Sequence, residues 1–300
     1  MAGMTARRSP SLVSVVIAVL NGEELFAAQL ESLVAQQVDV PWELVVADNG
    51  STDRTVDIAK RFASRVPHFV LVDASQQRGK QFAVRQGVAA SEGDLLAFVD
   101  HDDICAPGWL AALVAGAADV DAVSGALELT ALNEPAEIAA RPWVHIVDKL
   151  PQMLGGLPFP HAGNWAVWRD VWDTIDRPEG DLPHWAMGDD RVIGCMLARE
   201  GKSLGFAPDA VVHYRLRPVG TATRHQMRLY GRADPVLAKR YQDLGVCAEP
   251  LGRVLRRYAD IVPRALKAWA ERDDAHWARS EIAYSLGRLE GSIRCRVLCL

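Results

Sequence analysis

A short apolar run that ends in a group of carboxylates is the part of this sequence best suited to chemistry. Residues 95–99 are all apolar, which is typical of a buried strand, and Asp100, His101, Asp102 and Asp103 follow directly. Asp100 and Asp102 are two residues apart, so on extended backbone their side chains point the same way. Carboxylate oxygens are the ligands that hard cations such as Mg²⁺ and Mn²⁺ prefer. The pattern indicates a divalent-metal site, with a charged surface turn as the alternative.

Polar side chains also follow two other apolar runs. Asn21 and Glu23 come after the run at 13–19, and Asp48 comes after the run at 43–47. In an open parallel sheet the carboxyl ends of the strands meet at one edge, and ligands bind outside that edge. Three polar strand ends at the same edge favour a ligand site over a purely structural sheet.

The elements that must position these residues alternate between strand and helix in the first half of the chain. Apolar runs predict strands at 13–19, 43–47, 68–73 and 94–99, and the intervening patterns predict helices at 23–35, 53–64, 79–90 and 107–116. Continuous apolar strands that alternate with helices predict an α/β fold with a mostly parallel sheet, covered by helices on both faces.

The second half of the chain is less regular. It predicts a strand near 122–129, a helix at 190–200, and short strands at 203–206 and 210–213. Beyond residue 215 the chain is rich in arginine and its pattern is helical. We therefore expect a flexible N-terminus at 1–11, a catalytic domain at 12–215 and a helical C-terminal region at 216–300.

Composition and charge argue against several classes of protein. The chain has 300 residues and a net charge of −5, which argues against a nucleic-acid binder that works through a basic face. Its five cysteines form no CxxC pair, as expected for free thiols in a reducing compartment. No apolar run reaches the roughly 20 residues that span a bilayer, and no secretion signal is recognisable. We therefore expect a cytoplasmic protein.

Five segments, taken in order, resemble the motifs of family 2 glycosyltransferases. Residues 14–23 resemble the opening strand, 43–53 the second-strand signature, and 78–87 the glycine-containing helix. Residues 100–103 resemble the metal motif, and 188–192 resemble the later motif that supplies a catalytic base. The sequence departs from the usual pattern by small or polar-for-polar changes at Ala18, Asn49, Gln86 and Asp189.

The resemblance implies a fold of the GT-A type, which is Rossmann-like, and a metal-dependent, inverting transfer. Sugar would move from a nucleotide-diphosphate sugar to an acceptor hydroxyl, with Asp190 as the general base and Asp189 beside it. Mg²⁺ or Mn²⁺ would be held by Asp100, Asp102 and His213. The nucleotide sugar would be contacted by Asn21, Glu23, Asp48, Arg78, Arg85, Asp100 and Trp165.

Two nearby charged residues are expected to have structural roles. Lys80 fits a solvated helix face, and Asp103 fits a cap of the following helix. The aromatic side chains of this region could line a sugar-binding pocket, whereas Trp168 or Trp172 fits core packing.

Other functions and partners stay open at this point. A nucleotidyltransferase and a non-catalytic nucleotide-sugar-binding protein are the alternatives to a glycosyltransferase. The acceptor could be a glycan, a lipid-linked molecule or a small molecule, and the oligomeric state is not determined. Residues 251–269 have one apolar side and several basic residues, which fits either packing on the protein itself or peripheral contact with the inner face of an anionic membrane.

Overall fold

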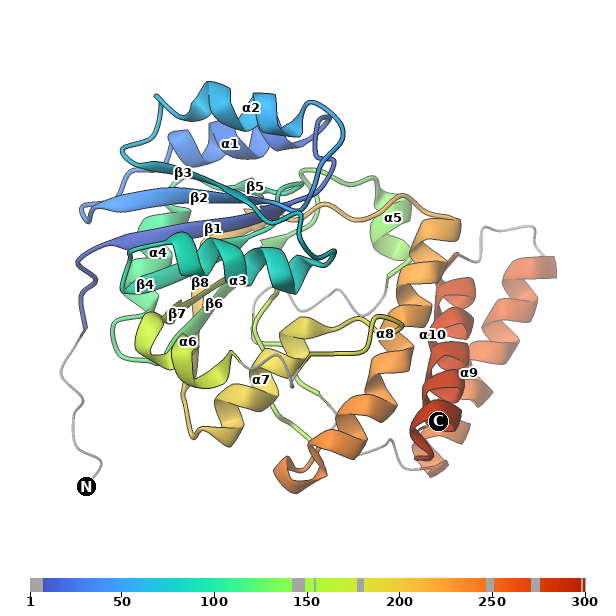
Figure 1. The fold of residues 1–300 in the computed structure, drawn as a ribbon. Coiled ribbons are helices and arrows are strands. Elements are labelled where there is room, and N and C mark those ends of the chain that lie inside the picture. Colours follow the sequence, from blue (N-terminus) through green and yellow to red (C-terminus); the bar gives the residue numbers. More distant parts are fainter. Residues whose placement is uncertain are drawn as a thin grey trace.

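A mixed sheet of eight strands forms the centre of the computed structural model (Figure 1). The structure describes residues 8–141, 149–153, 155–176, 181–246, 251–270, 276–297 and 299. Most of the N-terminal tail expected at 1–11 therefore lies outside the described residues. The strands run in the order β3-β2-β1-β4-β7-β6-β8-β5 across the sheet.

The first half of the sheet is parallel, as the alternating pattern predicts. It consists of β1 (Val13–Val19), β2 (Trp42–Asp48), β3 (Phe69–Asp73) and β4 (Leu95–Val99). The crossover helices are α1 (Phe26–Val34), α2 (Thr55–Phe62) and α3 (Lys80–Ala90). In Figure 1, α1 and α2 lie above the sheet and α3 lies below it, so these strands are covered on both faces.

The second half of the sheet is mixed, which the sequence pattern did not predict in detail. The strand β7 (Asn164–Trp168) lies between β4 and β6 (Ala122–Glu128) and is antiparallel to both. The strand β8 (Leu204–His213) is parallel to β6, and the short β5 (Ile104–Cys105) is antiparallel to β8. The two short strands expected at 203–206 and 210–213 are thus one strand, whose pairing with β6 shifts register after Gly125.

Aromatic side chains fill the core where the two halves of the sheet meet. The rings of Phe98 and Trp165 are stacked with centroids 4.7 Å apart, and Trp172 packs against both. The side chain of Trp165 is buried inside this core, and its expected contact with the nucleotide sugar stays a prediction. Trp168 is also buried, and its Nε1 donates a hydrogen bond to the carbonyl of Ala117 at 3.0 Å.

Helices make up most of the remaining chain. The helices α4 (Trp109–Gly116), α5 (Pro135–Ala139) and α6 (Arg169–Ile175) connect strands, and α7 (Asp189–Arg199) precedes β8. After β8 come α8 (Thr221–Arg240), η2 (Gln242–Leu244), α9 (Leu251–Ala270) and α10 (His276–Cys295).

The C-terminal region is helical, as expected, and it is not detached from the rest of the protein. The helix α10 packs along α8, and α8 contacts the segment before α7, where Leu229 O accepts a hydrogen bond from Met187 N. In Figure 1, α8, α10 and α9 stand together at the side of the molecule. The boundary expected between 215 and 216 stays a prediction. None of the helices in the described parts of the chain is long and apolar enough to cross a bilayer.

Candidate active site

Three aspartates come together directly after β4. Asp100, Asp102 and Asp103 each offer a carboxylate oxygen, and these oxygens lie within 4.8 Å of one another. The metal ligands expected at Asp100 and Asp102 are thus side by side, and Asp103 joins them although the sequence suggested only a capping role. An oxygen-rich group of this kind suits a hard divalent cation.

Asp103 is the most buried member of this carboxylate group, with 1% of its surface exposed. Its Oδ1 accepts a hydrogen bond from the Arg215 backbone N–H at 2.8 Å, whereas its buried Oδ2 has no partner among the described residues. Burial raises the pKa of Asp103 well above the ordinary value, and the negative charges of Asp100 and Asp102 raise it further. A buried carboxylate oxygen without a donor is expensive, so this arrangement fits a cation ligand.

A glycine leaves room beside the carboxylates. A Cβ atom on Gly163 would lie 3.1 Å from Asp100 Oδ2 and 3.2 Å from Asp103 Oδ2. Both contacts are tighter than a methyl group tolerates without displacing its neighbour. The space next to the two oxygens therefore depends on the absence of a side chain at Gly163, and the site fits a divalent cation held by the three aspartates.

Lys80, at the start of α3, is part of the site. Its Nζ forms an ion pair with Asp100 Oδ1 while 43% of its side chain stays exposed, so Lys80 is solvated as expected and is also paired with the carboxylate group. Burial works to lower the pKa of Lys80, but the charge and hydrogen bond of Asp100 outweigh it and raise the pKa above the ordinary value. Lys80 supplies a positive charge within a group of acids.

A second acidic pair begins α7. Asp189 and Asp190 follow Gly188, and Asp190 Oδ1 accepts a hydrogen bond from the Arg191 backbone N–H at 2.9 Å. Burial raises the pKa of Asp190, although the positive charge of Arg191 acts in the opposite direction. Burial also raises the pKa of Asp189, where a hydrogen bond from Gln81 opposes the shift. The charge of Lys80 acts on both carboxyls as well as on Asp100. Lys80 thus contacts the carboxylate group after β4 and also acts through its charge on the acidic pair of α7.

The polar residues after β1 and β2 tie two loops together. Asn21 Oδ1 accepts a hydrogen bond from Thr52 N at 2.9 Å, and Glu23 pairs with the side chain and backbone of Arg54. Asp48 accepts hydrogen bonds from the backbone N–H groups of Gly50 at 3.2 Å and Ser51 at 3.1 Å. These three side chains shape the edge of the sheet next to the carboxylate group.

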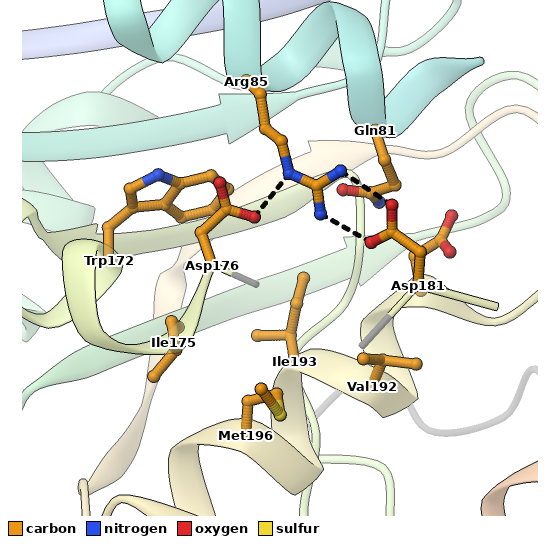
Figure 2. Close-up of a pocket in the computed structure, with 10 residues that line it drawn as sticks. Gln81, Arg85, Trp172, Ile175, Asp176, Asp181, Val192, Ile193 and Met196 are labelled. Carbon is orange, nitrogen blue, oxygen red and sulfur yellow. Dashed lines mark hydrogen bonds and ion pairs between the residues drawn. The ribbon is translucent and has the colours of Figure 1, made fainter. Parts of the chain in front are cut away.

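Arg85 lies away from the carboxylate group, in a pocket beside the start of α7 (Figure 2). Its Nε donates to Asp176 Oδ1 at 2.7 Å, and its Nη1 donates to Asp181 Oδ2 at 2.7 Å. The pocket is also lined by Gln81, Trp172, Ile175, Asp189, Val192, Ile193 and Met196. The role expected for Arg85 near the nucleotide stays a prediction, as does that of the exposed Arg78.

His213 ends β8 and is engaged by a neighbouring strand. Its Nδ1 lies 2.8 Å from Glu128 Oε2, in the register that pairs His213 with Glu128 of β6. Although burial opposes the shift, hydrogen bonds from Thr130 and His213 lower the pKa of Glu128 to about 2. The carboxylate group contains only aspartates among the described residues, so metal ligation by His213 stays a prediction.

Two residues that the sequence did not place in the metal site, Arg215 and Gly163, complete it. Arg215 donates from its backbone to Asp103 and from its Nε to the carbonyl of Asp102 at 3.0 Å, which fixes the turn after β4. In the sequence, the only signal for Arg215 is its place among several arginines that follow β8. Gly163 carries no signal of its own in a single sequence.

The fold is that of the GT-A glycosyltransferases. The structure superposes on a mannosyltransferase from Pyrobaculum calidifontis, solved with GDP-Man and Mn²⁺, with a TM-score of 0.67 at 20% identity over 94% of this chain and 88% of that one. It also superposes on glucosyl-3-phosphoglycerate synthase from Mycobacterium tuberculosis, with a TM-score of 0.50 at 23% identity over 77% and 80% of the two chains. At these identities the likeness establishes the fold.

Sequence comparison establishes the family. Residues 14–175 match the family described as Glycosyl transferase family 2, and the chain belongs to that family of glycosyltransferases. It is 29% identical over 224 residues to glycosyltransferase AglE of Haloferax volcanii, and the aligned residues make up 72% of this chain and 71% of that protein. It is 33% identical over 116 residues to the uncharacterized glycosyltransferase YibD of Escherichia coli, which covers 38% and 32%. The chain therefore spans most of AglE but about a third of YibD.

Proposed function

We propose that this glycosyltransferase is metal-dependent and inverting, and that it moves a sugar from a nucleotide-diphosphate sugar to an acceptor hydroxyl. The observation that carries the proposal is the carboxylate group of Asp100, Asp102 and Asp103, with its unpartnered buried oxygen and the space left by Gly163. The P. calidifontis mannosyltransferase binds GDP-Man and Mn²⁺, which supports a donor and a cation of these classes.

The aspartates would hold Mn²⁺ or Mg²⁺, which neutralises the charge that develops on a departing diphosphate. Lys80, paired with Asp100, adds a second positive charge on the same side. Asn21, Glu23 and Asp48 hold the two loops at the edge where the nucleoside would bind. We assign Asp100 to the ribose side of the cation and Asp102 to the cation itself.

Asp190 would act as the general base that takes the proton from the acceptor hydroxyl. Burial raises its pKa, and a carboxylate with a raised pKa is a stronger base. The hydrogen bond from the Arg191 backbone fixes Asp190 Oδ1, which leaves its other oxygen for the acceptor. A single base opposite the leaving group implies one displacement with inversion at the anomeric carbon.

The acceptor is a glycan, a lipid-linked molecule or a small molecule under this proposal, and the reaction takes place in the cytoplasm. Among the described residues, the thiols of Cys105, Cys195 and Cys295 are free, which supports a reducing compartment.

The test combines nucleotide sugars, Mn²⁺ and candidate acceptors and measures release of the nucleoside diphosphate. We expect Asp190→Asn to lower the turnover number roughly 100-fold or more, because a positioned base contributes that much. Donor binding, measured by calorimetry, should be nearly unchanged in Asp190→Asn and lost in Asp102→Asn. The exposed Asp39 provides the matched control, since Asp39→Asn makes the same chemical change far from the site.

Wild-type turnover in Asp190→Asn would remove Asp190 from the mechanism. Full activity in the presence of a chelator would show that transfer does not need a divalent metal. Retention of the donor's anomeric configuration in the product, measured by NMR, would contradict the single displacement.

A further inference from the structure

Large apolar side chains that are exposed gather on the last two helices. Among the described residues, every such side chain lies on α9 or α10, and each is between 44% and 71% exposed. The set is Leu255, Val262, Leu266, Ile282, Leu286, Leu289 and Ile293. Exposed apolar patches of this kind mark surfaces that bind a partner or a membrane.

The apolar residues of α10 form one stripe that faces away from α8. Ile282, Leu286, Leu289 and Ile293 are spaced by four, three and four residues, which places them on one side of a helix. The side that meets α8 carries Gly287 and Gly291 instead. The stripe is therefore not the packing face of α10.

The apolar residues of α9 are divided between the protein and solvent. Val254 is buried, whereas Leu255, Val262 and Leu266 form an exposed stripe with spacings of seven and four residues. Among the described side chains of α9, Val254 therefore packs on the protein, while Leu255, Val262 and Leu266 are left exposed.

The charge of α9 is opposite to that of the whole chain. The helix contains four arginines, one lysine and a single aspartate, in a chain with a net charge of −5. Arg253, Arg256 and Lys267 are exposed. On α10, the acidic Glu290 is paired with Arg228 and Arg232 of α8, which holds its charge away from α9.

We propose that α9 and α10 dock on an anionic lipid surface, with the exposed apolar stripes in the interface and the basic residues of α9 at the headgroups. Amphipathic helices with an apolar side and a basic polar side bind membranes in this way. Charge complementarity selects this occupant over a second copy of the chain, because a symmetric contact through α9 would bring two basic helices together. Docking itself does not require glycosyl transfer to take place.

The experiment uses the full chain and vesicles of two compositions. Sedimentation compares phosphatidylcholine alone with phosphatidylcholine that contains about one-third phosphatidylglycerol, at low and high salt. We expect the protein to pellet with the anionic vesicles only, and to be partly released by salt. Asp102→Asn should bind vesicles like the wild type, which separates docking from the proposed catalysis.

Two variants and one control locate the surface. Arg253→Gln with Arg256→Gln should weaken binding to anionic vesicles by about 30-fold, since each basic residue near the surface contributes roughly fivefold. The control is Lys60→Gln with Arg61→Gln on α2, which makes the same charge change at exposed positions elsewhere and should have no effect. Leu255→Ala with Leu266→Ala should also weaken binding while circular dichroism stays unchanged.

Equal pelleting with neutral and anionic vesicles, or none with either, would overturn the proposal. The proposal would also be overturned if the protein did not bind vesicles and light scattering gave the mass of a dimer. If Leu255→Ala with Leu266→Ala then restored the mass of a monomer, the surface would be assigned to a second copy of the chain.

Discussion

The negative charges of the carboxylate group are only partly balanced by neighbouring residues. Asp100 is paired with Lys80, and Asp103 Oδ1 with a backbone N–H of Arg215, while Asp103 Oδ2 has no donor among the described residues. Burial raises the pKa of Asp103, so the protein stabilises the neutral acid when no cation is near it. Because a carboxyl binds a cation in its ionised form, we expect the affinity of a cation at this position to rise with pH.

Gly163→Ala tests the space beside the aspartates. We expect Mn²⁺ binding to weaken roughly tenfold or more, because the added methyl group would press on the carboxylates of Asp100 and Asp103. The measurement is calorimetric titration with Mn²⁺ in the absence of a donor.

The matched control for Gly163→Ala is Gly252→Ala on α9, where a Cβ meets nothing within 4 Å. Its Mn²⁺ affinity should equal that of the wild type. Unchanged Mn²⁺ affinity in Gly163→Ala would show that the cation does not bind beside Gly163.

At the scale of elements, a carboxylate ties the amino ends of β1 and β4 together. Asp94, just before β4, accepts hydrogen bonds from the backbone of Ser11 at 3.0 Å and Leu12 at 3.2 Å, just before β1. Burial acts to raise the pKa of Asp94, but these hydrogen bonds outweigh it and hold the pKa below the ordinary value. The ionised form of Asp94 therefore stabilises the folded state.

Asp94→Asn tests this carboxylate through the pH dependence of stability. A carboxyl whose pKa is lowered by folding contributes stability above its unfolded pKa, near 4, and loses it as the pH falls through the folded value. We expect Asp94→Asn to lower the free energy of unfolding by about 1 kcal/mol at pH 7. The difference from the wild type should shrink as the pH falls below about 4.

Urea unfolding at several pH values measures the effect of Asp94→Asn. Asp39→Asn, in an exposed loop, should track the wild type throughout. A gap between Asp94→Asn and the wild type that is constant with pH would show that the charge of Asp94 does not contribute.

The sequence predicted the elements whose pattern of apolar and polar residues is contained in one short segment. The strands β1 to β4 agree with the predicted runs within one residue at each end, because each is a continuous apolar run between polar turns. The strand β7 was missed because it is short and its pairing with β4 and β6 depends on residues far along the chain.

The same distinction holds within the site. Asp100 and Asp102 were predicted because their spacing and the preceding strand are visible in one segment. The roles of Asp103 and Lys80 were not, because they depend on neighbours brought close by folding. Arg215, which donates to Asp103, is 112 residues further along the chain.

At the scale of the whole molecule, one aspartate joins the C-terminal helices to the acidic pair on α7. Asp234 of α8 pairs with Arg191 of α7, and its Oδ2 accepts a hydrogen bond from Tyr284 of α10 at 2.7 Å. Arg191 also donates from its side chain to the carbonyl of Tyr230 at 3.0 Å. Since the backbone of Arg191 holds Asp190, the region beyond 215 helps to position the proposed base.

Asp234→Asn should both destabilise the protein and slow transfer. The side chains of Arg191 and Asp234 are only 13% and 12% exposed, and loss of one partner of a buried ion pair costs about 3 kcal/mol. We expect the turnover number to fall while the donor affinity stays unchanged, because the donor edge of the sheet is not touched. Urea unfolding and steady-state kinetics measure the two effects.

The chain offers a matched control for Asp234→Asn in a second arginine of α7. Arg199 pairs with Asp243 of η2, whose side chain is 60% exposed. Asp243→Asn should change the free energy of unfolding by less than about 1 kcal/mol and leave turnover unchanged. Equal effects of Asp234→Asn and Asp243→Asn would contradict a special role for Asp234.

The helices α8 and α10 meet backbone to backbone, because a Cβ on Gly231, Gly287 or Gly291 would crowd a carbonyl oxygen of the other helix. This close contact holds α10 against α8, and Asp234 of α8 pairs with Arg191, the neighbour of Asp190. If α10 docks on a lipid surface, the position of α10 relative to α7 would set the height of Asp190, the proposed base, above the headgroups. A lipid-linked acceptor would then be selected by the length of its linker, without any contact with its sugar.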